Sequence, residues 1–110
     1  MKLIKAIVRP NKVDEVKDSL SKLNVSGVTV TEVRGHGKQK GHTAIYRGQE
    51  YNVSLLPKMQ IEVVVSDSVA DDVIKAIITS AKTGEIGDGR VFVLPVEQTY
   101  RIRTGERDSL

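Results

Sequence analysis

Residues 58–81 read KMQIEVVVSDSVADDVIKAIITSA, and a change of hydrophobic period inside this stretch decides the fold. In its first part apolar residues occupy every second position, which predicts a half-buried strand. These apolar residues are Met59, Ile61, Val63 and Val65. From Val69 onward apolar residues recur every three or four positions, which predicts an amphipathic helix, and Ser68 with Asp71 matches a capping box. The stretch therefore predicts one strand followed by one helix.

The same order occurs nearer the N terminus. Residues 2–9 have a period of two and are followed by Pro10, which has no N–H to donate to a sheet, so they predict a strand. Asn11 is a suitable N-cap for a helix that ends before Gly27. Further strands are expected at residues 28–33 and 91–96. The result is an α+β fold of ferredoxin-like βαββαβ type, an antiparallel sheet with two helices on one face.

The second face of this sheet is expected to be open and of mixed character. Its residues would be Ile7, Thr29 and Val64 together with Lys5, Gln60 and Glu62. A half-apolar open face predicts a contact between subunits, and a solvated face is the alternative.

Residues 35–57, between the second and third strands, show no sustained periodicity and are expected to form a long loop. Loops of more than about 12 to 15 residues inside a compact domain are usually functional or disordered. Tyr46 and Tyr51 flank Arg47 here, and these residue types are common binding anchors. The tyrosines could instead pack against the body of the domain and hold the loop still.

Length and composition limit the possible classes of protein. The 110 residues suit one domain, here residues 1–110, and the absence of cysteine excludes disulfides and thiolate chemistry. A net charge of +3 permits a nucleic-acid partner without requiring one. No apolar run approaches the roughly 20 residues of a membrane span, and residues 1–8 read as a strand and not as a secretion signal. The expected location is cytoplasmic.

Two glycine-rich segments, residues 35–41 and 84–90, are candidate anion sites. Glycine allows successive backbone N–H groups to converge on an oxyanion, and Lys38, Lys40 and Arg90 add charge. Neither segment matches the phosphate loop of NTPases or the dinucleotide fingerprint. Arg101 and Arg103, two residues apart, would point the same way in an extended segment and suit polyphosphate. The alternatives are an ordinary tight turn and a solvated basic tail.

The sequence offers no catalytic constellation. His36 and His42 are the only histidines and lack a cluster of carboxylates or cysteines at metal-ligand spacing. No serine or threonine has an evident His and Asp arrangement around it. The two central strands carry no aromatic residue for base stacking, which argues against a nucleic-acid module. A binding protein is therefore expected, and not an enzyme.

Two segments carry a resemblance to a known family. Residues 83–93, TGEIGDGRVFV, and residues 46–51, YRGQEY, resemble the two signatures of the nitrogen-regulatory PII signalling proteins, and the resemblance runs from Met1 to about Glu106. It implies a homotrimer with nucleotide clefts between neighbouring subunits. It also implies a T-loop at about 36–56, a B-loop at about 82–90 and a C-terminal loop at about 97–110.

The resemblance further implies a set of ligand contacts. ATP or ADP would bind competitively, with Arg101 and Arg103 reaching in from the next subunit and Lys38 in place of a commoner arginine. The implied nucleotide-binding residues are Thr29, Gly37, Lys38, Gln39, Glu62, Val64, Gly87, Asp88, Gly89, Arg90, Arg101 and Arg103. Gln39 would hold Mg²⁺ together with ligand oxygens. The implied 2-oxoglutarate site consists of Gln39, Lys40, Gly41, Lys58 and Gly87.

The implied function is regulation of protein partners through the long loop. Its conformation would depend on the bound effectors, and Arg47 would plug an ammonium transporter, which recruits the protein to the membrane. Tyr51 could receive a nucleotidyl group from a separate nucleotidyltransferase. The alternatives are a regulator of glutamine synthetase or another nitrogen enzyme, a metal-binding ferredoxin-like trimer, and a weak ATPase.

Overall fold

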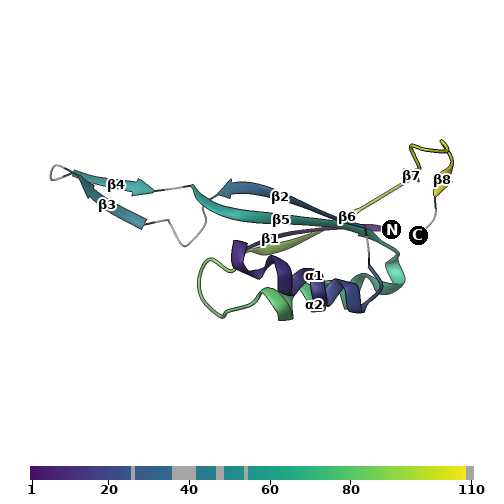
Figure 1. Cartoon of the computed structure of the whole chain (residues 1–110), viewed down its shortest axis with the longest axis horizontal. Helices are drawn as coiled ribbons and strands as arrows, with labels where there is room; N and C mark the ends of the chain where they lie inside the picture. Colours follow the sequence, from purple (N-terminus) through teal and green to yellow (C-terminus); the bar gives the residue numbers. More distant parts are fainter. Residues whose placement is uncertain (26, 36–41, 47–48, 54, 109–110) are drawn as a thin grey trace.

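The computed structural model describes residues 1–25, 27–35, 42–46, 49–53 and 55–108, with the backbone alone for the two ranges between 42 and 53. Its main sheet contains four strands, each antiparallel to its neighbours, in the order β2-β5-β1-β6. The strands are β1 (Lys2–Val8), β2 (Val28–Gly35), β5 (Leu56–Val65) and β6 (Arg90–Pro95). The helices α1 (Val13–Lys22) and α2 (Asp67–Ala81) lie side by side on one face (Figure 1). The predicted ferredoxin-like βαββαβ fold is confirmed.

The core lies between the sheet and the two helices. Alternate residues of the central strands face it, among them Ile4 of β1 and Ile61 of β5, which are almost fully buried. Leu20 of α1 and Ile77 of α2 meet them from the helical layer. Burial of these side chains is the main driving force for the fold, at roughly 25 cal/mol per Å² of apolar surface. The pattern follows directly from the period of two in the strands and the helical period in α2.

The predicted helix caps are wrong. Asn11 lies inside a short 3₁₀ turn, η1 (Pro10–Lys12), and Lys12 is the N-cap residue of α1. Pro10 favours this start because its fixed φ angle suits the first helical position. Ser66 is the N-cap residue of α2, and its hydroxyl contacts that of Ser68 instead of capping the helix.

The segment between β2 and β5 is not simply a loop. It contains a two-stranded hairpin, β3 (His42–Tyr46) and β4 (Gln49–Val53), which extends away from the body at one end of the sheet (Figure 1). Threonine, isoleucine, tyrosine and valine supply the β-propensity of these strands. The expectation of a segment without regular structure is therefore wrong for residues 42–46 and 49–53.

The C-terminal segment forms a second small hairpin at the opposite end of the sheet (Figure 1). Its strands are β7 (Thr99–Tyr100) and β8 (Arg107–Asp108), and residues 102–104 form the turn between them. The prediction that Arg101 and Arg103 share one side of an extended segment is wrong, because the chain reverses at this point. The backbone bond from Gly105 N–H to Arg101 O, 2.7 Å, closes the reversal.

Candidate functional site

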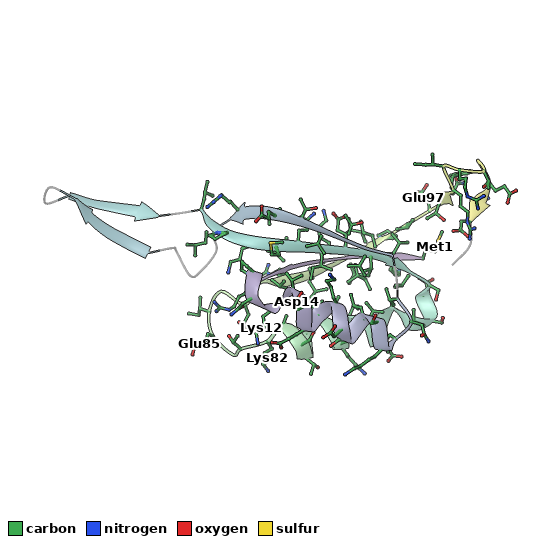
Figure 2. All side chains as sticks on the ribbon, in the orientation of Figure 1. Met1, Lys12, Asp14, Lys82, Glu85 and Glu97 are labelled. Carbon is green, nitrogen blue, oxygen red and sulfur yellow. The ribbon has the colours of Figure 1, made fainter. Side chains whose placement is uncertain are left out.

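The segment that joins α2 to β6, residues 82–90, is called the glycine-rich turn below. Figure 2 shows that Lys82 and Glu85 of this turn lie at the same end of the sheet as Lys12, and this is the end from which the β3–β4 hairpin leaves. The φ angles of Gly84, Gly87 and Gly89 are 90°, 102° and 100°. L-residues with a side chain rarely adopt such angles, so glycine allows the shape of this turn.

Asp88 organises the turn from within. Its carboxylate accepts the backbone N–H groups of Thr83 at 2.9 Å and Gly84 at 2.8 Å, and it also accepts the Thr83 hydroxyl. These hydrogen bonds, with the Thr83 hydroxyl first, hold the pKa of Asp88 well below its usual range. Asp88 is therefore an anion whose oxygen atoms are already occupied.

Arg9 ties the turn to the end of β1 and was not among the site residues predicted from the sequence. Its Nε donates to Asp88 Oδ1 at 3.1 Å, and its Nη2 donates to Ile86 O at 2.9 Å. Both side chains of this ion pair are about three-quarters buried, at 24% and 23% exposed. The only sequence signal for Arg9 is a basic residue between a strand and a proline, which is weak.

Lys58 on β5 reaches the same turn and donates from Nζ to Gly87 O at 2.6 Å. Partial burial lowers the pKa of Lys58, and the nearby Arg9 guanidinium lowers it further, while Asp88 opposes both effects. Lys58 and Arg9 thus place two cations close together at the turn, as an anion site requires. Of the residues implied for 2-oxoglutarate, the structure brings together Lys58 and Gly87.

Gly89 lies directly against β1. A Cβ atom added to Gly89 would come within 1.7 Å of Ile7 O and 2.7 Å of Ile7 C. This contact is with backbone atoms that cannot move without disturbing the sheet. Glycine is thus required at position 89 both by its positive φ and by the space available.

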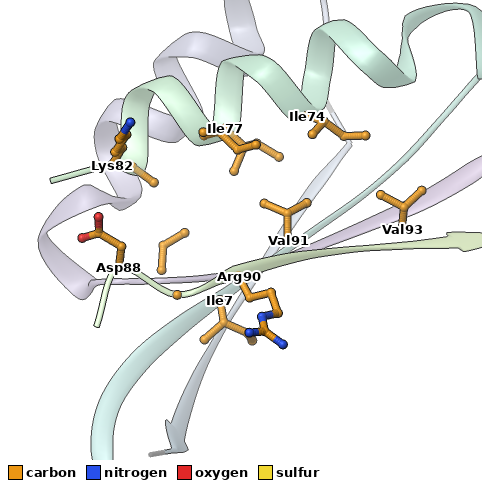
Figure 3. A pocket seen from close by; sticks show the side chains of 12 residues that line it. Ile7, Ile74, Ile77, Lys82, Asp88, Arg90, Val91 and Val93 are labelled. Carbon is orange, nitrogen blue, oxygen red and sulfur yellow. The ribbon is translucent and has the colours of Figure 1, made fainter. Parts of the chain in front are cut away.

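Arg90 begins β6 opposite Ile7, and its side chain lies on the open face of the sheet. Figure 3 shows Ile74 and Ile77 of α2 facing Val91 of β6 across an apolar groove of about 350 Å³, while Arg90 points to the other side of the strand. The groove thus borders the glycine-rich turn at Asp88 and Gly89, while the Arg90 guanidinium points away from its apolar part.

The residues implied for the adenine and ribose lie elsewhere on the open face. Thr29 of β2 is opposite Glu62 of β5, and Val64 follows on the same face of β5. All three line a shallow cavity of about 530 Å³ that also contains Thr99 and Asp108. Lys58, which contacts the glycine-rich turn, precedes Glu62 by four residues, or about 13 Å along a strand. The two halves of the implied nucleotide site are thus separated within one chain.

Arg101 and Arg103 lie in the C-terminal hairpin, at the opposite end of the sheet from the glycine-rich turn (Figure 1). Arg101 Nε is 3.4 Å from Asp108 Oδ2, and the arginine side chain is 58% exposed. The structure does not bring these arginines to the turn of their own chain. The remaining implied residues, Gly37, Lys38, Gln39, Lys40, Gly41 and Arg47, lie outside the described residues, and only the backbone of Tyr51 is described.

Comparisons with known proteins decide the family. The family model described as Nitrogen regulatory protein P-II matches residues 1–106. The chain belongs to the P-II family. It is 54% identical over 109 residues to the nitrogen regulatory protein P-II of Rhizobium etli, which covers 99% of this chain and 97% of the relative. It is 56% identical over 108 residues to the P-II protein of Haemophilus influenzae, with 98% and 96% covered. Identity to the P-II 1 protein of Escherichia coli is 53% over 108 residues.

Membership of the P-II family decides the class of protein. The proteins of this family are regulatory signal-transduction proteins and not enzymes, so the predictions of a signalling role and of no enzymatic activity are confirmed by the family.

Within the described residues, no group of three or more His, Asp or Glu side chains could hold a metal ion, and no helix is long and apolar enough to cross a membrane. His36, one of the two histidines behind the metal-binding alternative, lies outside the described residues.

Proposed function

We propose that the protein senses ATP, ADP and 2-oxoglutarate at sites between the subunits of a homotrimer and passes the result to nitrogen-related partner proteins. The observation that carries this proposal is the arrangement of Lys58 and Arg9 at the glycine-rich turn. Both cations contact the glycine-rich turn, and Lys58 lies near the start of β5, the strand that follows the β3–β4 hairpin. Ligand binding and the binding of partners would therefore share one end of the molecule.

The glycine-rich turn would hold the nucleotide phosphates. Backbone N–H groups at Gly87, Asp88 and Gly89 would point at phosphate oxygens, and Arg90 would add a forked, charged donor from the open face. Lys38 and Gln39 would complete this half, together with Gly37. ATP and ADP compete because both need the same donors.

The 2-oxoglutarate carboxylates would meet Lys58 beside the phosphates, with Gln39, Lys40, Gly41 and Gly87 completing the site. The pKa of Lys58 is lowered by burial and by its neighbour Arg9, so a bound anion relieves an existing repulsion. Lys58 and Arg9 are cations and do not suit a metal ion. An Mg²⁺ ion would be held by Gln39 and ligand oxygens, and it would bridge the two effectors.

The positions of the two basic regions support a site between subunits. Arg101 and Arg103 lie at the end of the sheet opposite the glycine-rich turn, so they can meet such a turn only on another chain. The cavity of Thr29, Glu62 and Val64 is next to the same C-terminal hairpin, since Thr99 and Asp108 line it. A neighbouring subunit would therefore bring phosphate donors to the adenine pocket. The half-apolar open face, which carries Leu3 and Phe92, supports this association.

The segment at about 36–56 would select the partner. The β3–β4 hairpin within it extends from the body, which suits insertion into a partner's cavity (Figure 1). We propose an ammonium transporter as the main partner, with Arg47 as the plug, a cytoplasmic location and recruitment to the membrane through that transporter. Glutamine synthetase or another nitrogen enzyme is the alternative partner. Tyr51, in β4, is the proposed site of modification by a nucleotidyltransferase.

Titration calorimetry tests the proposed function. ATP is titrated into the purified protein in the presence of Mg²⁺, with and without 2-oxoglutarate. Reciprocal linkage requires that each ligand tighten the other if the two sites are coupled. Lys58→Met is expected to remove the effect of 2-oxoglutarate and to leave ATP binding in place. Binding of ATP with no effect of 2-oxoglutarate would reduce the protein to an energy sensor, and no ATP binding would overturn the proposal.

A further inference from the structure

We propose that Asp88 is a positioning residue whose carboxylate holds the glycine-rich turn in its anion-binding conformation and makes no contact with the ligand. The inference rests on the proposed function for the identity of the ligand, but its structural part stands independently. It assigns a role to an acidic side chain that lies in the middle of an otherwise cationic site.

The geometry of the carboxylate supports this role. Asp88 accepts four hydrogen bonds, two from Thr83, one from the Gly84 N–H and one from Arg9 Nε. Oδ1 takes the Thr83 hydroxyl and Arg9, while Oδ2 takes the two backbone N–H groups. Both oxygens therefore face the start of the turn, and Oδ1 also faces Arg9 at the end of β1.

These bonds close the turn into a ring. Thr83 and Asp88 are five residues apart, and their contacts bring the two ends of residues 83–88 together. The Thr83 hydroxyl also accepts the Glu85 N–H at 3.1 Å. The Thr83 side chain is thus bonded both to Asp88 at the far end of the ring and to Glu85 near its start. Gly87 and Gly89, on either side of Asp88, have positive φ angles. The carboxylate thus fixes a backbone that three glycines would otherwise leave free.

Arg9 connects the hydrogen-bonded ring of the turn to the main sheet. It binds the Asp88 carboxylate and the Ile86 carbonyl with different nitrogen atoms of one guanidinium group. A planar guanidinium with two partners fixes both direction and distance. Asp88 therefore also determines where Arg9 lies, and Arg9 is one of the two cations of the proposed anion site.

The direction in which Asp88→Asn changes the affinity for ATP distinguishes a positioning role from a simple electrostatic one. Asp88 is negative, as phosphate is, so through space its charge opposes the ligand. If charge alone mattered, Asp88→Asn would tighten ATP binding. If the carboxylate positions the turn, the same substitution weakens ATP binding, because an amide cannot accept the same set of N–H and O–H donors.

Glu85 provides a matched control. It lies in the same turn, its side chain is exposed, and its backbone N–H makes the contact to Thr83. Glu85→Gln removes one negative charge at nearly the same place but keeps every hydrogen bond described above. We expect Asp88→Asn to weaken ATP binding by about tenfold or more, and Glu85→Gln to change it by less than about twofold.

The experiment has two independent readouts. The first is the dissociation constant of ATP, with and without Mg²⁺, for the wild-type protein, Asp88→Asn, Glu85→Gln, Thr83→Val and Thr83→Ser. A positioning role predicts the same fold-loss in both conditions for Asp88→Asn, a similar direction for Thr83→Val and recovery in Thr83→Ser, which keeps the hydroxyl. A loss seen only with Mg²⁺ would make Asp88 a metal contact and overturn the inference, as would unchanged or tighter binding.

The second readout is amide hydrogen exchange of residues 83–89 without ligand. Asp88→Asn is expected to speed exchange at Thr83 and Gly84 while the protection of β1 and β5 remains. Unchanged exchange at these two amides would overturn the inference. This measurement does not need ATP binding, so failure of the proposed function and failure of the positioning role are distinguishable. If Asp88→Asn does not fold, Thr83→Val, compared with Thr83→Ser, provides the same test.

Discussion

The glycine-rich turn and the C-terminal hairpin both carry arginine at the ends of one sheet, but they are fixed to different degrees. The turn receives Arg9, which follows β1, and Lys58 of β5, and it closes on the Asp88 carboxylate. The hairpin has two two-residue strands and one exposed ion pair, Arg101 with Asp108 at 3.4 Å. Preorganised donors lose little entropy on binding, whereas exposed ones must be ordered by the ligand. Changes in the turn should therefore have large effects on geometry, and changes in the hairpin should have small, salt-dependent effects.

The largest expected effect is that of Gly89→Ala. The new Cβ would lie 1.7 Å from Ile7 O, at a φ of 100° that alanine disfavours. We expect the free energy of unfolding to fall by about 3 kcal/mol or more, measured by urea denaturation at constant protein concentration. ATP binding should be lost as well.

Gly84→Ala is the matched control for this loss. Gly84 has a φ of 90°, but a Cβ there meets no atom within 4 Å. The substitution carries only backbone strain, so we expect a loss of about 1 kcal/mol. Equal losses for the two variants would show that the contact between the turn and β1 does not determine the stability of this region.

The next largest effect concerns Lys58. A dicarboxylate bound beside Lys58 raises the pKa of its amine toward the ordinary value, so binding should take up protons at alkaline pH. Calorimetry of 2-oxoglutarate binding in buffers of different ionisation enthalpy measures this uptake. Lys58→Arg keeps the positive charge at every accessible pH and should remove the uptake. Uptake that persists in Lys58→Arg would place the titrating group elsewhere.

A smaller effect is expected in the pH dependence of stability. The folded-state pKa of Asp88 is below its unfolded value, so its contribution is complete above about pH 4 and is lost as the pH falls further. The difference in stability between the wild-type protein and Asp88→Asn should therefore be constant, within measurement error, from about pH 5 to about pH 8. It should shrink below about pH 4. Thermal unfolding at several pH values tests this, with Glu85→Gln as control. A difference that grows in acid would contradict the hydrogen-bond network.

The smallest effect should come from the C-terminal hairpin. Arg101→Ala is expected to weaken ATP binding by about fivefold, with a weaker effect at high salt, because the side chain is exposed. Asp108→Asn removes the partner of Arg101 and should tighten ATP binding slightly. If both variants weaken binding equally, the ion pair itself is needed, and the hairpin is as preorganised as the turn.

The sequence predicted the parts of the molecule that depend on local periodicity. The alternation at residues 59–65 and the helical period after Ser68 led directly to β5 and α2. Pro10 was recognised as the end of a strand, but the 3₁₀ turn that it begins was not predicted, since capping preference and proline geometry compete there. The hairpin of β3 and β4 was not predicted, because residues 35–57 show no sustained periodicity in the sequence.

The candidate site was predicted only in part for a different reason. Glycines and basic residues are typical of an anion-binding turn, so residues 87–90 could be named as candidates from the sequence. Arg9 was missed because its contact with Asp88 spans 79 positions in the chain and exists only after β1 and β6 pair. The role of the Asp88 carboxylate was also hidden, since its donors come from a hydroxyl, backbone groups and a distant guanidinium.

The most direct test of the account uses trimers that mix two defective subunits. One subunit carries Arg90→Glu in the glycine-rich turn, and the other carries Arg101→Glu with Arg103→Glu in the C-terminal hairpin. Each variant alone should bind ATP poorly, because a reversed charge repels phosphate, whereas the neutral Arg101→Ala only removes an attraction. If a site takes its turn from one chain and its hairpin from the next, equal co-expression should restore about a quarter of the sites at wild-type affinity. Recovery of no site in the mixed protein would contradict a nucleotide site shared between subunits.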